Sequence, residues 1–287
     1  TSCRIILSPP ETVISEEACL FPFRDPDSGM FLLFVFTNSK CPDILLCENP
    51  FFGNLQPFNS IHETDFEFVA GVDGKIWLVR SNKDGDRVVM AHGVTPEIPP
   101  QIMFDKIPGS RGLVLHDRKG GLFVVSEGLS YDILYQSHRP GADFNPVLEV
   151  PGSVFRGGTV TANGEFFGAI SSWNRPFEFV STGDLDWISD LDRTPGNPDT
   201  PEIKQEVLSF CSPDGTKVFV TLLRTDKNIG PAKTILYCYG GFGMSLRPRY
   251  IGYLLAWLKD GNCLAFAHVR GGGEFGQAWH NAGKGHL

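Results

Sequence analysis

Short apolar runs alternate with turn-forming residues along the first two thirds of the chain. Up to about residue 200, runs rich in Val, Ile, Phe, Leu and Trp are bounded by Gly, Pro, Asp or Asn. The clearest runs are 30–37, 43–48, 66–70, 75–80, 87–91, 112–116, 121–126, 132–136, 159–161, 165–171 and 177–181. None of these stretches has a helical period of 3.6 residues. Dense short strands joined by glycine-rich turns indicate a sandwich, a barrel or a propeller.

A loose repeat separates these three architectures. Segment 72–79, Val-Asp-Gly-Lys-Ile-Trp-Leu-Val, is similar in pattern to segments 118–125 and 162–169. Each pairs a polar, glycine-containing turn with an apolar strand, and the starts lie about 45 residues apart. That period suits one four-stranded propeller blade per repeat. The repeat therefore predicts that residues 1–202 form a β-propeller portion of about four blades.

The pattern of apolar and polar residues changes after a connector that is rich in proline and glycine. The connector, 194–201, reads Thr-Pro-Gly-Asn-Pro-Asp-Thr-Pro. Strand-like runs follow at 206–211 and 217–223, and the Ser-Pro-Asp-Gly at 212–215 between them predicts a hairpin.

Two continuous apolar runs, 234–239 and 263–269, follow the hairpin. Such runs are typical of strands buried on both faces of a sheet. Residues 250–258, between them, are predicted to form an amphipathic helix. This order predicts that residues 203–287 are the start of an α/β domain. Because an open parallel edge is a poor place for a domain to end, we expect the sheet to continue past Leu287.

Composition and charge argue against a disordered chain, a nucleic-acid partner and a membrane-spanning helix. Hydrophobic residues make up 41% of the chain and charged residues 20%, so a packed core is expected rather than disorder. The net charge of -8 is spread along the chain, whereas a nucleic-acid partner needs clustered Lys and Arg. The longest apolar run, 30–36, is strand length, so no membrane helix is expected.

The cysteines do not suggest a metal or redox site. None of the seven has the C-x-x-C spacing of such sites, and their number is odd. Four lie inside apolar runs: Cys47, Cys211, Cys238 and Cys263. The pattern favours reduced, buried thiols in a cytoplasmic protein over disulfides.

Glycines near the end of the chain allow two interpretations. Gly271, Gly273 and Gly276 satisfy G-x-G-x-x-G after the apolar run 263–269, which on paper is a dinucleotide fingerprint. A dinucleotide site would also need an acidic residue ~20 positions further on, and the given sequence stops before that position. The alternative is a backbone turn that leaves a sheet with positive φ.

Tyr239-Gly240-Gly241-Phe242 directly follows the third predicted strand of the second domain. In α/β-hydrolases one oxyanion donor comes from the loop that leaves the third strand, where glycines let the backbone approach the substrate. A phenol hydroxyl there can also donate to the developing oxyanion. The spacing alone leaves an aromatic turn at a strand end as an equal alternative.

Residues 234–280 resemble the start of the peptidase domain of the prolyl oligopeptidase family. In that family a strand ending Tyr-x-Tyr-Gly-Gly-Phe precedes Ser-x-x-Pro, a further strand, Arg-Gly-Gly-Gly-Glu and Trp-His. This chain has Ser245 and Pro248, then 270–274, then 279–280. The Ser-Pro-Asp-Gly-Thr-Lys at 212–217 also resembles the family's entry hairpin, so the match covers about 80 residues, and the repeats in 1–202 are similar to the family's propeller. The triple glycine favours this family over a nucleotide site.

The resemblance implies roles for individual residues. Tyr239 matches the tyrosine whose hydroxyl helps to form the oxyanion hole. Phe242 matches an aromatic residue that lines the primary specificity pocket and packs against proline. Arg270 and Glu274 are expected to be scaffold residues. Cys238 departs from the family, since glycine is usual at that position.

A nucleophile is the element that the sequence does not supply. No serine has Gly at both -2 and +2, and Ser130 and Ser245 have it at -2 only. The resemblance implies that the catalytic Ser, Asp and His all follow the Trp-His segment, so the histidines at 280 and 286 are expected to be structural. No role is expected for the other histidines considered, His62, His92, His116 and His138.

The sequence thus predicts part of a serine peptidase that cleaves short proline-containing peptides through an acyl-enzyme. The given chain is expected to be an internal piece that is inactive alone, truncated before the nucleophile. We expect a monomer with no cofactor, no metal, no nucleic-acid partner and no membrane association. The alternative, from another functional class, is a non-catalytic propeller protein used for binding; a third is a nucleotide-binding module.

Overall fold

The structure is a computed structural model, and it describes the strands and loops in eleven stretches of the chain. These are residues 19–24, 31–36, 43–47, 56–57, 66–72, 75–81, 87–93, 101–109, 112–183, 200–228 and 230–285. The chain divides into two compact units, Thr1–Ile107 and Pro108–Leu287, and each is described by itself. The predicted boundary at residue 202 falls inside the second unit and stays a prediction.

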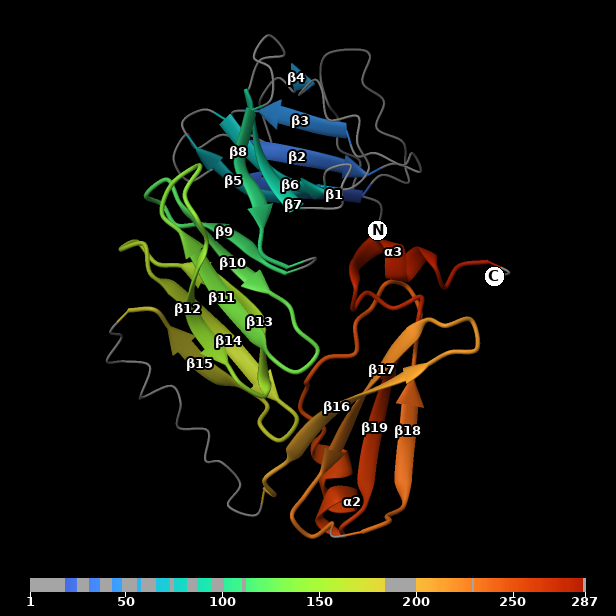
Figure 1. Ribbon diagram of the computed structural model, residues 1–287. Helices are drawn as coiled ribbons and strands as arrows, with labels where there is room; N and C mark the ends of the chain where they lie inside the picture. Colours follow the sequence, from blue (N-terminus) through green and yellow to red (C-terminus); the bar gives the residue numbers. More distant parts are fainter. Residues whose placement is uncertain are drawn as a thin grey trace, which may run out of the picture. The chain divides into compact units, whose positions relative to one another are not determined.

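The first unit contains two antiparallel sheets whose strands follow one another in chain order (Figure 1). One sheet holds β1 (Cys19–Arg24), β2 (Phe31–Phe36), β3 (Asp43–Cys47) and β4 (Gln56–Pro57). The other holds β5 (Phe66–Val72), β6 (Lys75–Ser81), β7 (Arg87–Gly93) and β8 (Gln101–Ile107). Trp77 of β6 packs on Phe104 of β8, with 5.7 Å between ring centroids, and both side chains are buried.

The second unit begins with two more antiparallel sheets of the same kind. The first holds β9 (Val114–His116), β10 (Leu122–Ser126), β11 (Asp132–Ser137) and β12 (Asn145–Val150). The next holds β13 (Ser153–Val160), β14 (Phe166–Ser172) and β15 (Glu178–Ser181). Phe123, Phe155 and Phe166 form the centre of a core shared by the two sheets.

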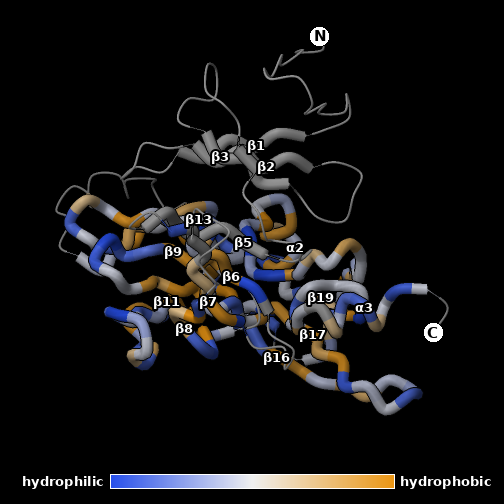
Figure 2. The backbone as a smooth tube through the Cα atoms, turned by 90° about the horizontal axis from the view of Figure 1, so that it is seen from above, coloured by the Kyte–Doolittle hydropathy of each residue, from blue (hydrophilic) through white to orange (hydrophobic). Residues whose placement is uncertain are grey.

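The predicted repeat falls on equivalent strands of successive sheets. Its apolar half lies in β6, β10 and β14, each of which is the second strand of its sheet in chain order. Along the described chain, apolar and polar stretches alternate in the backbone tube (Figure 2). Local pairing of each strand with the next gives the sheets this order, since a short turn joins antiparallel neighbours.

A mixed sheet completes the second unit (Figure 1). It is built from β16 (Lys204–Cys211), β17 (Lys217–Arg224), β18 (Thr234–Cys238) and β19 (Cys263–His268), in the order β16-β17-β19-β18. Strand β18 is parallel to β19, and β17 is antiparallel to it. The segment between β18 and β19 contains the short helices η1 (Gly252–Leu254) and α2 (Leu255–Lys259), where the sequence predicts one helix. A last helix, α3, spans Gly276–Asn281.

The core of the mixed sheet extends to Trp173, just after β14. Trp173 stacks on Phe266 of β19 with 4.6 Å between centroids, and its carbonyl accepts a hydrogen bond from the amide of Ile251. Trp173, Leu223, Ile251, Leu258 and Phe266 belong to one buried cluster. The two parts of the second unit therefore share apolar packing.

Two burial predictions are wrong for this sheet. All six residues of β19 are buried as predicted, but all five residues of β18 are exposed, because β18 is an edge strand of the sheet in the described part of the chain. Cys211 and Cys238 are exposed for the same reason, since each lies on an edge strand, whereas Cys263 on β19 is buried. Cys47 falls on a strand whose side chains lie outside the described part of the structure.

No helix among the described residues is long and apolar enough to cross a membrane.

Candidate functional site

The loop that leaves β18 carries both residues predicted for the site. Tyr239 is 45% exposed at the end of the strand, and Phe242 is 88% exposed. The backbone turns sharply between them, with φ of +61° at Gly240 and +55° at Phe242. Phenylalanine rarely adopts a positive φ, so the loop holds Phe242 in a strained conformation.

The Arg-Gly-Gly-Gly-Glu segment after β19 packs against this loop and forms backbone hydrogen bonds with it. The Gly243 amide donates to the Gly271 carbonyl at 3.0 Å, and the Gly273 amide donates to the Met244 carbonyl at 3.3 Å. Gly271 has φ +95°, and a Cβ there would lie 2.1 Å from the Gly240 carbonyl oxygen. The triple glycine thus allows the two backbone segments to approach closely, which explains why glycine is needed here without a nucleotide ligand.

Helix α3 fixes the far side of the glycine segment. The Trp279 carbonyl accepts from the Gly271 amide at 3.1 Å, and His280 Nδ1 lies 2.8 Å from the Gly271 carbonyl. His280 therefore contacts backbone rather than an acid or a nucleophile.

Arg270 and Glu274 hold structural contacts at the two ends of the segment. Arg270 Nη1 is 2.5 Å from Asp214 Oδ2 in the turn between β16 and β17. The Thr216 amide, and then Arg270, hold the pKa of Asp214 well below its usual range. Glu274 Oε1 accepts a hydrogen bond from the Leu246 amide at 2.9 Å, which ties the site loop to the glycine segment.

A buried histidine accompanies Glu274. His268 Nδ1 lies 3.5 Å from Glu274 Oε1, and His268 Nε2 lies 2.7 Å from the Thr221 hydroxyl. The side chains of His268 and Glu274 are 1% and 2% exposed. Burial raises the pKa of the Glu274 carboxyl, but His268 and the Leu246 amide outweigh burial and hold this pKa below its ordinary value.

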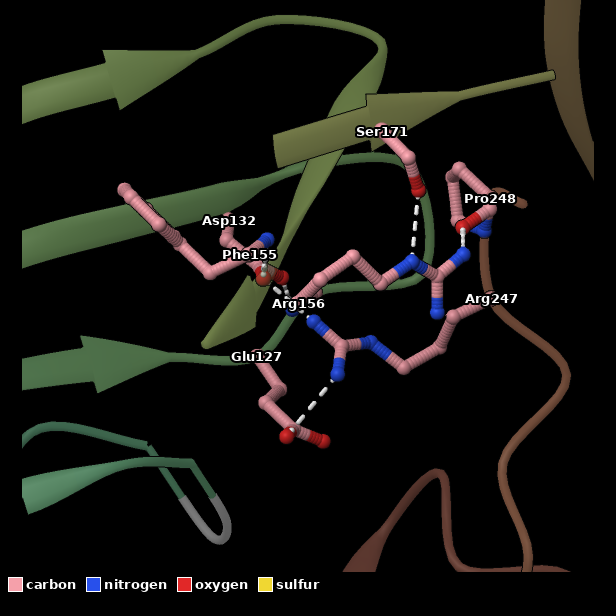
Figure 3. Close-up of polar contacts among 8 residues, drawn as sticks. Glu127, Asp132, Phe155, Arg156, Ser171, Arg247 and Pro248 are labelled. Carbon is pink, nitrogen blue, oxygen red and sulfur yellow. Dashed lines mark hydrogen bonds and ion pairs between the residues drawn. The ribbon is translucent and has the colours of Figure 1, made fainter. Parts of the chain in front are cut away.

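An arginine network joins the site loop to the antiparallel sheets of the second unit (Figure 3). Arg247 Nη1 is 2.8 Å from Glu127 Oε1, and Arg247 Nη2 pairs with Asp132 Oδ2. The Asp132 side chain is 0% exposed. It also accepts hydrogen bonds from the amides of Phe155, at 2.9 Å, and Gly128, at 3.1 Å. The buried carboxylate is therefore fully partnered, as a buried charge must be.

Arg156 makes the second link of the network. Its Nε donates to the Ser171 hydroxyl on β14, and its Nη2 donates to the Pro248 carbonyl, both at 2.5 Å (Figure 3). Arg156 therefore connects β13 to β14 and to the site loop. Burial lowers the pKa of the Arg156 guanidinium, and the positive charges of Arg247 and Arg249 lower it further.

A cavity of about 530 Å³ lies where these elements meet. Its lining is Glu127, Arg156, Trp173, Tyr237, Tyr239, Met244, Ser245, Leu246, Arg247, Arg249 and Phe266. Tyr239 is on the wall, whereas Phe242 is not part of the lining. The cavity combines aromatic rings, hydroxyl groups and guanidinium groups, which suits a polar organic ligand with an apolar portion.

Comparison with known proteins shows which proteins this chain is similar to. No family model matches the chain. A prolyl endopeptidase of Elizabethkingia miricola is 27% identical over 232 residues, which cover 77% of this chain and 32% of that protein. Prolyl oligopeptidase A of Amanita bisporigera is 41% identical over 90 residues, or 30% of this chain and 12% of that protein. Over these segments the chain is similar in sequence to prolyl endopeptidases and prolyl oligopeptidases.

The fold agrees with solved prolyl oligopeptidases. Prolyl oligopeptidase B of Galerina marginata, bound to a 35mer hydrolysis and macrocyclization substrate, superposes with a TM-score of 0.75 at 18% identity. The superposition covers 93% of this chain and 40% of that one. The chain thus spans well under half the length of the relatives that it matches, and the resemblance predicted from its motifs is confirmed.

Sequence reasoning found part of this site and missed the rest. It named Tyr239 and Phe242, which the structure places on one loop, and their roles stay predictions. It missed Arg156, Arg247 and Asp132, which come from segments far apart in the chain. The one available signal was the Ser-x-x-Pro of prolyl oligopeptidases, because Arg247 occupies the position directly before its proline.

No group of three or more His, Cys, Asp or Glu side chains in the described part of the chain is arranged to hold a metal ion.

Proposed function

We propose that this chain supplies the oxyanion-hole and specificity part of a serine peptidase that cleaves short peptides after proline. The observation that carries the proposal is the position of Tyr239. It stands at the end of a parallel strand, before a glycine turn, and on the wall of a cavity. The relationship to prolyl endopeptidases supports it.

The proposed architecture has two parts. Residues 1–202 would be about four blades of a β-propeller, one for each antiparallel sheet of the described chain. Residues 203–287 would begin an α/β-hydrolase domain, with β16 and β17 as its entrance hairpin and β18 as its third strand. A propeller over the site would admit short peptides only.

Tyr239 would act through its phenol hydroxyl. As a nucleophile attacks the carbonyl carbon after proline, negative charge develops on the carbonyl oxygen, and a fixed donor stabilises that charge. Support from Gly271 and Glu274 would hold the loop in place before the reaction, so little reorganisation is needed. Phe242 would offer a flat ring to the proline of the substrate.

The nucleophile, the base and the orienting carboxylate would lie outside these 287 residues. No serine in the chain has the G-x-S-x-G context of a nucleophile elbow. We therefore expect the purified chain to leave a chromogenic prolyl peptide intact. A longer form that includes a G-x-S-x-G segment should cleave the peptide and react with a fluorophosphonate. Turnover by the 287-residue chain at an enzyme's rate would overturn this division of the site.

A non-catalytic propeller protein used for binding is the second candidate, and the succession of antiparallel sheets in the described chain supports it. The two functions differ in the reading frame after Leu287. A G-x-S-x-G segment within ~50–60 codons supports the peptidase, because the elbow follows the next strand of the sheet. A stop codon directly after Leu287 supports the binding protein.

A further inference from the structure

The cavity beside Tyr239 carries more positive than negative charge. Three of its lining residues are arginines, at 156, 247 and 249, and one is a carboxylate, Glu127. This excess is unusual in a chain whose net charge is -8.

The three guanidinium groups differ in how far they are neutralised. Arg247 has two carboxylate partners, Glu127 and Asp132. Arg156 has only the neutral acceptors Ser171 and Pro248. No hydrogen bond or ion pair joins Arg249, which is exposed, to any other residue in the described part of the chain. The guanidinium groups of Arg156 and Arg249 therefore form no ion pair among the described residues, although the Asp132 carboxylate interacts with Arg156 through space.

The neighbouring groups fit an anion. The pKa of Arg156 is lowered by its burial and by the charges of Arg247 and Arg249, and the Asp132 carboxylate opposes this shift. The hydroxyl groups of Ser245 and Tyr239 are available as further donors on the same lining. Planar guanidinium groups match a carboxylate in shape and bind it with charge-assisted hydrogen bonds.

We propose that Arg156 and Arg249 form a subsite that binds a carboxylate of the peptide substrate close to the scissile bond. This inference rests on the proposed function, since it assigns a charge preference to the same cavity. The carboxylate would come from the C-terminus of a short peptide or from an acidic side chain. In both cases the arginines would orient the peptide and favour acidic substrates over neutral ones.

The test is calorimetric titration of the full chain with three matched peptides. The first is acetyl-Ala-Gly-Pro-Ala-Gly with a free carboxylate, and the second is its C-terminal amide. The third is the amide with Glu in place of the Ala after proline. We expect one or both acidic peptides to bind about tenfold more tightly than the neutral amide, as one charge-assisted hydrogen bond would provide. This preference should shrink at high salt. The peptide that shows it identifies the source of the carboxylate.

Variants separate the subsite from general effects of charge. Arg249→Gln and Arg156→Gln should each reduce the preference severalfold, and Arg249→Lys should retain part of it. Arg175→Gln is the matched control, because Arg175 is exposed, pairs with Glu178 and does not line the cavity. Thermal melts will show whether each variant is folded, and Arg249→Gln is the safest of them, since Arg249 has no hydrogen bond or ion pair to lose among the described residues.

The possible outcomes distinguish the two proposals. Equal binding of acidic and neutral peptides would overturn the carboxylate subsite and leave the peptidase proposal standing. A preference that survives in the double variant Arg156→Gln/Arg249→Gln would also overturn the subsite. If none of the peptides binds, both proposals fail.

Discussion

The carboxylate of Asp132 is fully buried and is paired with the guanidinium of Arg247, 115 residues away in the chain. Asp132 lies at the start of β11, and Arg247 lies on the loop that follows Tyr239. The same carboxylate binds the amides of Gly128 and Phe155. One buried group therefore fixes the site loop against two antiparallel sheets.

Removing Arg247 should destabilise the protein strongly. Arg247→Met leaves the Asp132 charge buried with amide donors only, and we expect the free energy of unfolding to fall by about 3 kcal/mol. The measurement is urea unfolding followed by circular dichroism.

The double variant Asp132→Asn/Arg247→Met distinguishes a lost ion pair from lost packing. It removes both charges, so it should recover much of the stability that Arg247→Met loses. Arg175→Met, which breaks the exposed pair with Glu178, should cost less than about 1 kcal/mol. Equal losses for Arg247→Met and Arg175→Met would contradict the importance of the buried pair.

Glu274 should contribute to stability above its unfolded-state pKa and lose that contribution in acid. Its folded-state pKa is lowered from the ordinary value of 4.5, so folding favours the ionised form. The contribution is therefore complete above about pH 5 and disappears as the pH falls through the folded-state pKa. We expect Glu274→Gln to be less stable at neutral pH and to show a flatter decline between neutral and acidic pH.

Unfolding free energies at a series of pH values provide the measurement. Glu178→Gln is the control, because Glu178 is in an exposed pair with Arg175. A parallel decline in the wild type and Glu274→Gln would show that other carboxylates cause the acid sensitivity.

Phe242→Gly should raise stability slightly. The positive φ of Phe242 costs about 1–2 kcal/mol, and its 88% exposure means that little packing is lost. Glycine removes this strain but adds about 0.5–1 kcal/mol of unfolded-state entropy, so the net gain should be about 0.5 kcal/mol. Met244→Gly, on the same loop without a positive φ, should lower stability instead. Denaturant midpoints of the two variants shifted in the same direction would argue against stored strain at Phe242.

The strands were predictable because their signals are local. Apolar runs and turn residues marked most of β5 to β19, and the loose repeat marked the second strand of three successive sheets. The edge position of β18 was not predictable, since its run of apolar residues is the same for a central and an edge strand. The pairing of Asp132 with Arg247 was also not predictable from the sequence, because it depends on how segments far apart in the chain pack together.

The loop sequence Tyr-Gly-Gly-Phe was informative for a different reason. Its aromatic and glycine residues have a shared local pattern that marks a strand end and a turn, and the structure has both. The arginines that line the cavity, Arg156, Arg247 and Arg249, are not part of any local sequence pattern that predicts a site. They could be identified only from the cavity lining.

Tyr239→Phe should separate catalysis from binding in a form of the protein that carries the catalytic serine. The variant loses one hydroxyl donor, and we expect kcat to fall about 100-fold with little change in KM, as for other oxyanion-hole donors. Tyr237→Phe is the matched control, because Tyr237 lines the same cavity two residues earlier on β18 and packs its ring on Phe266. Its kcat should stay within about twofold of the wild-type value, since no donor to the oxyanion is removed. If Tyr239→Phe retained wild-type kcat, or if both variants lost activity equally, the hydroxyl of Tyr239 would have no special part in the reaction.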